Sequence, residues 1–171
     1  MMLDKHMHDL ILRDAEQSDA TAIADIYNEH IRIGMSTMDR TLQSAQDIQA
    51  WIDGFNEREL ILVLEEAGII IGWGIIKRYS EREGYRFACE TAVYLKSDQL
   101  GKGHGTYIKK EIIERCRQFS YHHLVAKIFS GNTGSIIYNQ KLGYEVVGTQ
   151  KQIGHVNGKW MDVIIMQLLL N

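Results

Sequence analysis

The chain has 171 residues, 45% of them hydrophobic and 24% charged, with a formal net charge of −3 at pH 7. This length and composition suit a single domain over residues 1–171 that needs no disulfide or metal to fold. No basic run exceeds two residues, which argues against nucleic-acid binding, and no window approaches the roughly 18 apolar residues of a membrane span. The opening segment, residues 1–8, lacks the apolar core of a signal peptide, and we expect it to be a mobile N-terminal extension.

The first half of the chain predicts, in order, a strand, two helices and a β-hairpin. These elements cover residues 10–13, 20–31, 48–55 and 60–78. Ser18 or Asp19 can cap the first helix, whose apolar positions recur three and four residues apart. Ser44 and Asp47 resemble a capping box ahead of the second helix. The hairpin consists of two β-branched-rich runs joined by a turn at residues 66–68.

The second half of the chain predicts four strands and two helices. The strands are expected at residues 86–95, 123–129, 144–149 and 159–170, and the helices at residues 104–119 and 135–141. Gly143 stands where a helix C-cap glycine is expected, and Asn157-Gly158 is a strong signal for a two-residue hairpin turn. The whole order is β, α, α, β, β, β, α, β, α, β, β, which predicts a mixed α/β domain without an internal repeat or linker.

A glycine-rich stretch, QLGKGHGTY (residues 99–107), lies between a predicted strand and a predicted helix. Free amide N–H groups at the start of that helix, together with the helix dipole, would form an anion site. The stretch fits neither the Walker A pattern nor the spacing of the Rossmann fingerprint. A pyrophosphate carried by another cofactor, or a glycine turn without a ligand, both remain open on these residues alone.

Several segments of the chain resemble one enzyme family. The stretch Gln99-Leu100-Gly101-Lys102-Gly103-His104 is similar to the glycine-rich acetyl-CoA signature of the GNAT N-acetyltransferases. The segments IYNEHI, GYRFACETAVYL, GNTGSIIYNQKLGYEVVG and GKWMDVIIMQLLL are similar, in order, to the phosphinothricin/methionine-sulfone acetyltransferase branch. The resemblance implies the GNAT fold, in which helices flank a twisted, mixed and mostly antiparallel central sheet. It also implies a homodimer.

The resemblance implies where acetyl-CoA would bind. In this family the strand before the glycine loop separates from its neighbour and pairs with the pantetheine arm, a role that falls on Val93, Tyr94 and Leu95. The pyrophosphate would lie on the amides of Gly101, Lys102, Gly103, His104, Gly105 and Thr106. Asn132 matches the family's asparagine that contacts the cofactor arm, and Lys141 is a weaker candidate.

The resemblance also implies a direct transfer of acetyl from the thioester to an amine. An ammonium has no lone pair, so the substrate must lose a proton before or during attack. Glu90 matches the family's strand glutamate that accepts this proton directly or through water, although a solvent-facing carboxylate is the alternative. Tyr138 stands where many members place a hydroxyl that can protonate the departing thiolate, and an aromatic packed on the core is its alternative.

The substrate is expected to be a small amino-acid-like amine of the phosphinothricin, methionine sulfone or methionine sulfoximine type. Arg82 and Arg86, in and after the loop SEREGY, are the cations expected to bind the substrate carboxylate, with Glu90 and Thr91 beside them. The relatives commonly read Glu-His-Ser where this chain has Glu90-Thr91-Ala92. This departure puts phosphinothricin itself in doubt.

Other functions remain as alternatives to this interpretation. A protein N-terminal acetyltransferase and a non-catalytic acyl-CoA sensor use the same scaffold, and a nucleotide-dependent oxidoreductase is the weakest alternative. Cys89 and Cys116 are the only cysteines, and their spacing indicates neither a metal site nor a disulfide framework but a reduced cytoplasmic protein. The resemblance implies acetyl-CoA as the co-substrate, and we expect no metal. A nucleophilic role for Cys89 lacks a histidine partner in the sequence.

Overall fold

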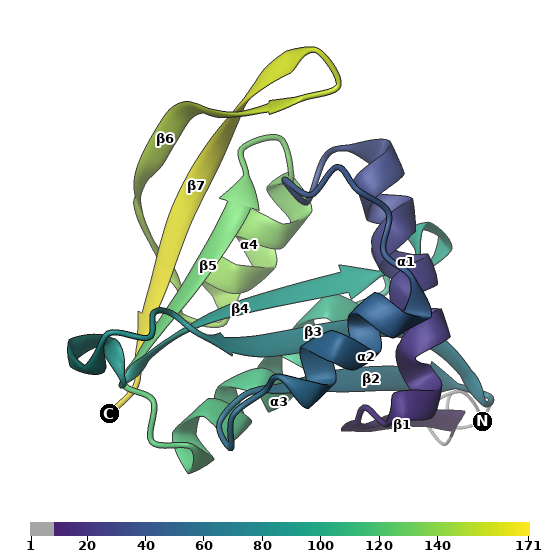
Figure 1. The fold of residues 1–171 in the computed structure, drawn as a ribbon. Coiled ribbons are helices and arrows are strands. Elements are labelled where there is room, and N and C mark those ends of the chain that lie inside the picture. Colours follow the sequence, from purple (N-terminus) through teal and green to yellow (C-terminus); the bar gives the residue numbers. More distant parts are fainter. Residues whose placement is uncertain (1–8) are drawn as a thin grey trace, which may run out of the picture.

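A computed structural model describes residues 9–171 as three layers, with a sheet between two pairs of helices (Figure 1). The strands are β1 (Leu10–Asp14), β2 (Leu60–Glu66), β3 (Ile69–Arg78), β4 (Ala88–Leu95), β5 (His123–Phe129), β6 (Glu145–Val156) and β7 (Lys159–Leu169). The α-helices are α1 (Ala20–Ile33), α2 (Ala45–Asp53), α3 (His104–Gln118) and α4 (Thr133–Lys141). This architecture confirms the predicted α/β class and the predicted order of elements. The extension expected at residues 1–8 lies outside the described residues.

The sheet has seven strands in the order β1-β2-β3-β4-β5-β7-β6, and β4 and β5 form its parallel pair. Their ladder has three residue pairs and ends at Glu90 opposite Val125. On its other edge, β4 stays paired with β3 as far as Leu95. Beyond Glu90 the strands therefore separate, and Figure 1 shows β4 and β5 running in different directions from this point.

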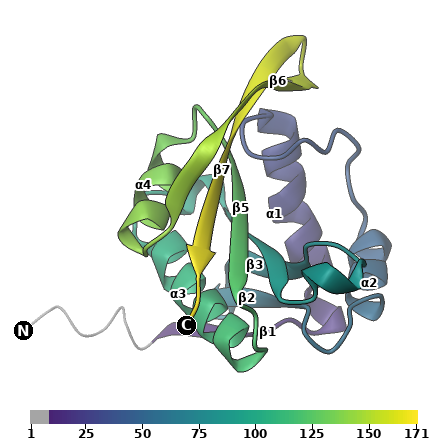
Figure 2. The ribbon, with the colours of Figure 1, turned by 90° about the vertical axis from the view of Figure 1, so that its left-hand side faces the viewer.

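The two helix pairs cover opposite faces of the sheet (Figure 2). On β2, Ile61 and Val63 pack with α1 and α2, whereas Leu62 and Leu64 pack with α3. This alternation follows from the period of two residues along a strand. Each fully buried side chain of this size contributes roughly 1.5–3 kcal/mol to folding, so the two cores fix both helix layers against the sheet.

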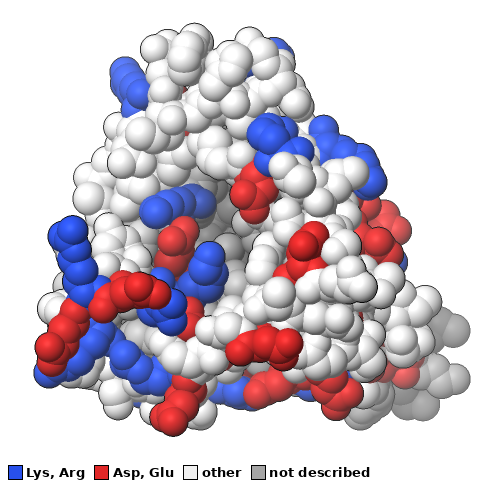
Figure 3. Space-filling model, in the orientation of Figure 1, with Lys and Arg blue, Asp and Glu red and all other residues white. Residues whose placement is uncertain are grey.

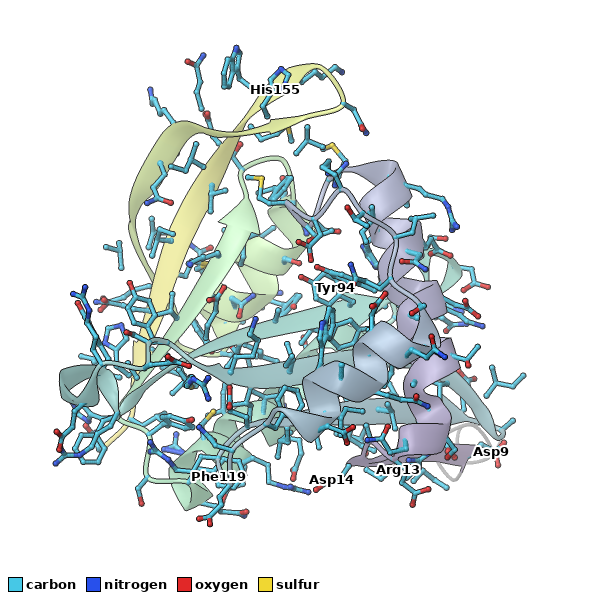
Figure 4. The ribbon with its side chains drawn as sticks, viewed as in Figure 1. Asp9, Arg13, Asp14, Tyr94, Phe119 and His155 are labelled. Carbon is cyan, nitrogen blue, oxygen red and sulfur yellow. The ribbon has the colours of Figure 1, made fainter. Side chains whose placement is uncertain are left out.

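A cluster of charged side chains ties the edge strand β1 to the beginning of α1. The Arg13 guanidinium donates to both carboxylate oxygens of Asp19, at 2.7 and 2.9 Å, and to Glu65 of β2 at 2.6 Å. Figure 4 labels Arg13 below α1. These bonds to Arg13 hold the pKa of the Asp19 carboxyl below its usual range. Asp19 is the N-cap residue of α1, one of the two predicted positions, but its side chain makes no capping hydrogen bond to the helix and instead binds Arg13.

The turns follow the predicted residues, but one strand is longer than predicted. Asn157 and Gly158 both have positive φ, 49° and 78°, as a type I′ hairpin turn requires. Strand β6 continues to Val156 rather than ending at residue 149. Its far half is polar, exposed and bulged near Gln152, which has a φ of 55°. The alternation of apolar residues that identifies a strand is therefore missing there.

Candidate active site

The separation of β4 from β5 opens the sheet between two hollows. A cavity of about 640 Å³, here called the large cavity, lies on the side of α1 and α2. A crevice of about 40 Å³, here called the crevice, is lined by residues of α3 and α4 on the other side. Both are lined by Thr91, Ala92 and Tyr94 of β4 and by Lys127 and Phe129 of β5. The gap between the strands therefore joins the two faces, and Figure 3 shows the hollow with acidic and basic side chains at its rim.

The glycine-rich stretch forms a turn that leaves the first amides of α3 free. Gly101 and Gly103 have φ of +75° and +84°, which favours glycine. Gly105 packs closely against Tyr138, because a Cβ there would lie 3.2 Å from the Tyr138 ring and the ring would have to shift. Within residues 9–171, no backbone acceptor meets the amides of His104, Gly105 or Thr106, and the Tyr107 amide is the first to bond back, to Gly103. Such amides fit an anionic phosphate group.

The edge of β4 that faces the gap is free of β5 from Thr91 onward. Val93, Tyr94 and Leu95 are still paired with β3, so only one edge of the strand is available. At the far end, His30 of α1 contacts the Leu95 carbonyl oxygen through Nε2 at 2.6 Å. This geometry fits the expected pairing of the free edge with an extended arm. Because His30 contacts the Leu95 carbonyl, Val93 and Tyr94 are the residues of the edge that remain available to the arm.

Helix α4 brings two of the expected residues to the crevice and leaves a third outside. Asn132 caps the helix, its side chain accepting from the Ser135 amide at 3.4 Å, and it lines the crevice. Tyr138 also lines the crevice, and burial raises the pKa of its hydroxyl. Lys141 is exposed in the last turn and is not among the lining residues. Its expected cofactor contact has no support in this geometry.

Glu90 projects into the large cavity between two lysines. Its Oε2 lies 3.6 Å from the Lys127 Nζ, and its side chain is 35% exposed. Lys77 is its register partner on β3, so the two side chains are neighbours on one face of the sheet. Within the described residues no carboxylate is bridged to Lys77, whereas the neighbouring Arg78 is bridged to Glu59 and Glu81. The cavity thus holds a carboxylate beside a cation that is available to a ligand.

Aromatic rings form the other wall of the large cavity. Tyr27 makes edge contacts with Trp51, Trp73 and Tyr94, at centroid distances of 5.5, 5.7 and 5.1 Å. Figure 4 labels Tyr94 in this cluster, between β4 and α1. The Tyr27 hydroxyl contacts Asp39 and Thr37, which also line the cavity. This wall suits an apolar side chain of moderate size.

The residues expected to bind the substrate carboxylate lie elsewhere. Arg82 and Arg86 are exposed around a 3₁₀ turn and do not line the large cavity. Arg86 is bridged to Glu83 at 3.5 Å and stacks on Phe87. The Thr91 hydroxyl bonds to Lys109 and Tyr144, on the face of β4 opposite the Glu90 side chain. Arg82 and Arg86 therefore lie outside the large cavity, whereas Thr91 and two other cations, Lys77 and Lys127, line it.

The sequence interpretation also missed Lys109, a buried lysine of α3. Gly105, Lys109, Ile112 and Cys116 are spaced by four, three and four residues and form one buried face of the helix. A lysine in that apolar series is the signal that could have identified it. Lys127 gives a similar signal, because it lies on the same face of β5 as the buried Val125 and Phe129.

Cysteine and metal chemistry have little basis in the described residues. Cys89 and Cys116 are free and buried, with their sulfur atoms 3.7 Å apart. The contact with Cys116 and burial raise the pKa of the Cys89 thiol, so a nucleophilic thiolate is disfavoured. Among residues 9–171, no group of three or more His, Cys, Asp or Glu side chains could hold a metal ion, and no helix is long and apolar enough to cross a membrane.

Comparisons with known proteins agree with this geometry. Residues 12–165 match a family model described as an acetyltransferase (GNAT) domain. The chain is 33% identical to an L-methionine sulfoximine/L-methionine sulfone acetyltransferase of Pseudomonas paraeruginosa, covering 94% of each protein. It is 32% identical to an L-amino acid N-acyltransferase of Escherichia coli, again covering 94% of each. A protein of Salmonella typhimurium, solved with its cofactor acetyl-CoA, superposes with a TM-score of 0.92 at 29% identity over 95% of both chains.

Proposed function

The chain belongs to the GNAT acetyltransferase family, and from this premise we propose that it acetylates the amine of a small amino-acid-like substrate with acetyl-CoA. The observation that carries the proposal is the gap after Glu90, which joins a crevice beside free helix amides to a cavity beside a carboxylate. Such a gap lets two substrates approach one strand from opposite faces. The chain is similar to an L-methionine sulfoximine/L-methionine sulfone acetyltransferase and to an L-amino acid N-acyltransferase, and these names support the substrate class.

Residues of α3, β4 and α4 fit acetyl-CoA. The amides from Gly101 to Thr106 would hold its diphosphate, the free edge at Val93 and Tyr94 would hold its arm, and Asn132 would contact that arm. When bound there, acetyl-CoA supplies an acetyl group activated as a thioester. The unpaired edge of β4 keeps this group in reach of the large cavity.

Glu90 and its neighbours would prepare the amine. The Glu90 carboxylate accepts the proton that the substrate ammonium must lose, directly or through a water molecule. Lys77 and Lys127 place positive charge beside it, which suits the carboxylate of an amino acid held next to its amine. The Tyr138 hydroxyl, on the crevice side, donates a hydrogen bond to the departing sulfur.

The size and lining of the large cavity support a small-molecule substrate. A volume of about 640 Å³ is within the usual range for small-molecule sites. The aromatic wall accommodates an apolar side chain, and the Thr37 hydroxyl can donate a hydrogen bond to an oxygen-bearing tip. Methionine sulfone and methionine sulfoximine have this combination, and phosphinothricin adds an anionic tip.

A substrate panel tests the proposal. Purified protein with acetyl-CoA should release free thiol with methionine sulfone or sulfoximine, and more slowly with phosphinothricin. A peptide with a free N-terminus and a polyamine lacking a carboxylate should react at least tenfold more slowly. Release with the peptide alone would favour the N-terminal acetyltransferase, and binding of CoA without release with any amine would favour the acyl-CoA sensor.

We also infer that the protein is a cytoplasmic homodimer. Exposed apolar side chains on β6 and β7, among them Val147 and Trp160 at 57% and 64% exposure, support pairing of two chains through these strands. The unbonded Cys89 and Cys116 suit a reducing compartment. Sedimentation equilibrium should give twice the chain mass, and Trp160→Lys should shift it toward the monomer.

A further inference from the structure

Lys109 is a buried lysine in the wall of the crevice. Its side chain is 1% exposed, and it lines the crevice together with Asn132 and Tyr138. The Nζ donates to the Thr91 hydroxyl at 2.7 Å and lies 4.8 Å from the centre of the Tyr144 ring. A long charged side chain is rarely buried in this way without a counter-charge.

No carboxylate neutralises Lys109 among the described residues. The groups around it are Cys89, Glu90 and Thr91 of β4, Cys116 of its own helix, Tyr144 ahead of β6, and Tyr138 and Lys127 across the crevice. Of these, Glu90 is the single carboxylate, and it is bridged to Lys127 on the other face of the sheet. Burial therefore lowers the pKa of Lys109 to about 7.

The crevice thus contains two candidate acids of different strength. A free cysteine thiol has a pKa of roughly 8.5, so an ammonium with a pKa of about 7 can protonate a thiolate at least this basic downhill. Burial raises the pKa of Tyr138 above its ordinary value, which makes its hydroxyl a poor proton source. Tyr138 remains able to donate a hydrogen bond to the sulfur.

We propose that the Lys109 ammonium is the acid that gives a proton to the coenzyme A sulfur as the acetyl group leaves, an inference that rests on the proposed function. The bond between the sulfur and the carbonyl carbon breaks, and the sulfur keeps the electron pair and takes a proton from Nζ. Lys109 becomes a neutral amine and regains a proton from water. The amine nitrogen loses two protons, one from the ammonium before attack and one after the new C–N bond forms, and Glu90 passes both to solvent. Because Lys109 takes one proton back, each turnover releases one proton in total.

Stability of the cofactor-free protein gives a readout that is independent of activity. Because the folded pKa of Lys109 is below the unfolded value of roughly 10.4, wild-type stability should rise relative to Lys109→Met as pH increases from 7 to 10. Lys109→Met should melt several degrees higher than wild type at pH 6, where the buried charge is present. Lys110→Met, at the exposed neighbouring position, should show neither effect.

The chemical step is then measured in single-turnover experiments with bound acetyl-CoA. Lys109→Met should slow acetyl transfer by about 100-fold at pH 6.5, with affinity for acetyl-CoA changed less than twofold. The wild-type rate should fall above pH 7 as Lys109 loses its proton. This alkaline limb of the pH–rate profile should be absent in Lys109→Met. Lys110→Met should match wild type throughout.

Thr91→Val keeps the lysine and removes the acceptor of its hydrogen bond. Since that bond favours the charged form, the variant should move the alkaline limb of the transfer rate to lower pH. If the alkaline limb of Thr91→Val lay at the same pH as that of wild type, the proposal would be overturned, even if Lys109→Met failed to fold. A transfer rate of Lys109→Met within twofold of wild type would also overturn it. If wild type acetylated no amine, the proposed function would fail, while the pH-dependent stability would still report the buried ammonium.

Discussion

On one face of β4, Cys89 and Thr91 are at most 2% exposed and pack against α3, whereas on the other face Glu90 and Tyr94 border the large cavity. The same eight residues therefore contribute to a buried core and to an open site. The difference arises from the alternation of side chains along the strand together with the loss of β5 after Glu90. A strand that leaves its neighbour partway keeps its core and gains a free edge.

Replacing the carboxylate on the open face should have the largest effect. Glu90→Gln keeps the shape of the side chain but cannot accept the amine proton, so kcat should fall about 10²- to 10³-fold. The rate of thiol release under saturating acetyl-CoA measures kcat. The exposed Glu83→Gln should remain within twofold of wild type, and a Glu90→Gln enzyme with near-normal kcat would remove the functional contrast between the two faces.

A change far from β4 separates stability from activity. Asp19→Asn removes the charge that Arg13 binds and should cost about 2 kcal/mol of unfolding free energy at pH 7. Because the folded pKa of Asp19 is lowered, its contribution is present above pH 4 and should disappear as pH falls further. Urea denaturation at pH 7 and pH 3 measures the loss of unfolding free energy and its pH dependence. The exposed Asp25→Asn is the control, and kcat of the Asp19→Asn variant should be unchanged. An equal loss at both pH values would contradict the ionic origin.

The cation of the open face should control substrate affinity. Lys77→Met removes the positive charge beside Glu90 and should raise KM for the amino acid about tenfold. It should leave KM for acetyl-CoA unchanged, because Lys77 lines the large cavity and not the crevice. Arg82→Met is the matched control, since Arg82 is outside the cavity. A larger effect from Arg82 would restore the interpretation drawn from the sequence.

The smallest expected effect concerns the cofactor side. Gly105→Ala would place a Cβ 3.2 Å from the Tyr138 ring, so the ring must shift by a few tenths of an ångström. Affinity for CoA should fall about threefold, while the melting temperature should not fall, because alanine favours the helix by about 1 kcal/mol. Calorimetry measures the affinity. Gly84→Ala, with open space around it, should change neither quantity.

Features encoded by local sequence could be predicted. Ser44 caps α2 through the Asp47 amide at 3.1 Å, as the capping-box pattern indicates, and Asn157-Gly158 forms the hairpin turn. The free amides of α3 follow from the glycines ahead of them. Each of these depends on a few consecutive residues and on backbone preferences that tertiary packing leaves intact.

Features that depend on which strands meet could not be predicted. Lys77 and Lys127 flank Glu90 because β3, β4 and β5 are neighbours, which the chain order alone does not determine. Arg82 and Arg86 were expected in the site because their loop precedes β4, but a 3₁₀ turn leaves them exposed. Lys109 belongs to an intermediate case, since its place in the apolar series is visible but its hydrogen bond to Thr91 is not.

A crystal structure of the protein with acetyl-CoA tests the central claim most directly. We predict the diphosphate on the amides of His104, Gly105 and Thr106, the arm along the free edge of β4, and the thioester at the gap beside Glu90. Finding the arm away from that edge, or the diphosphate bound to side chains elsewhere, would contradict the account.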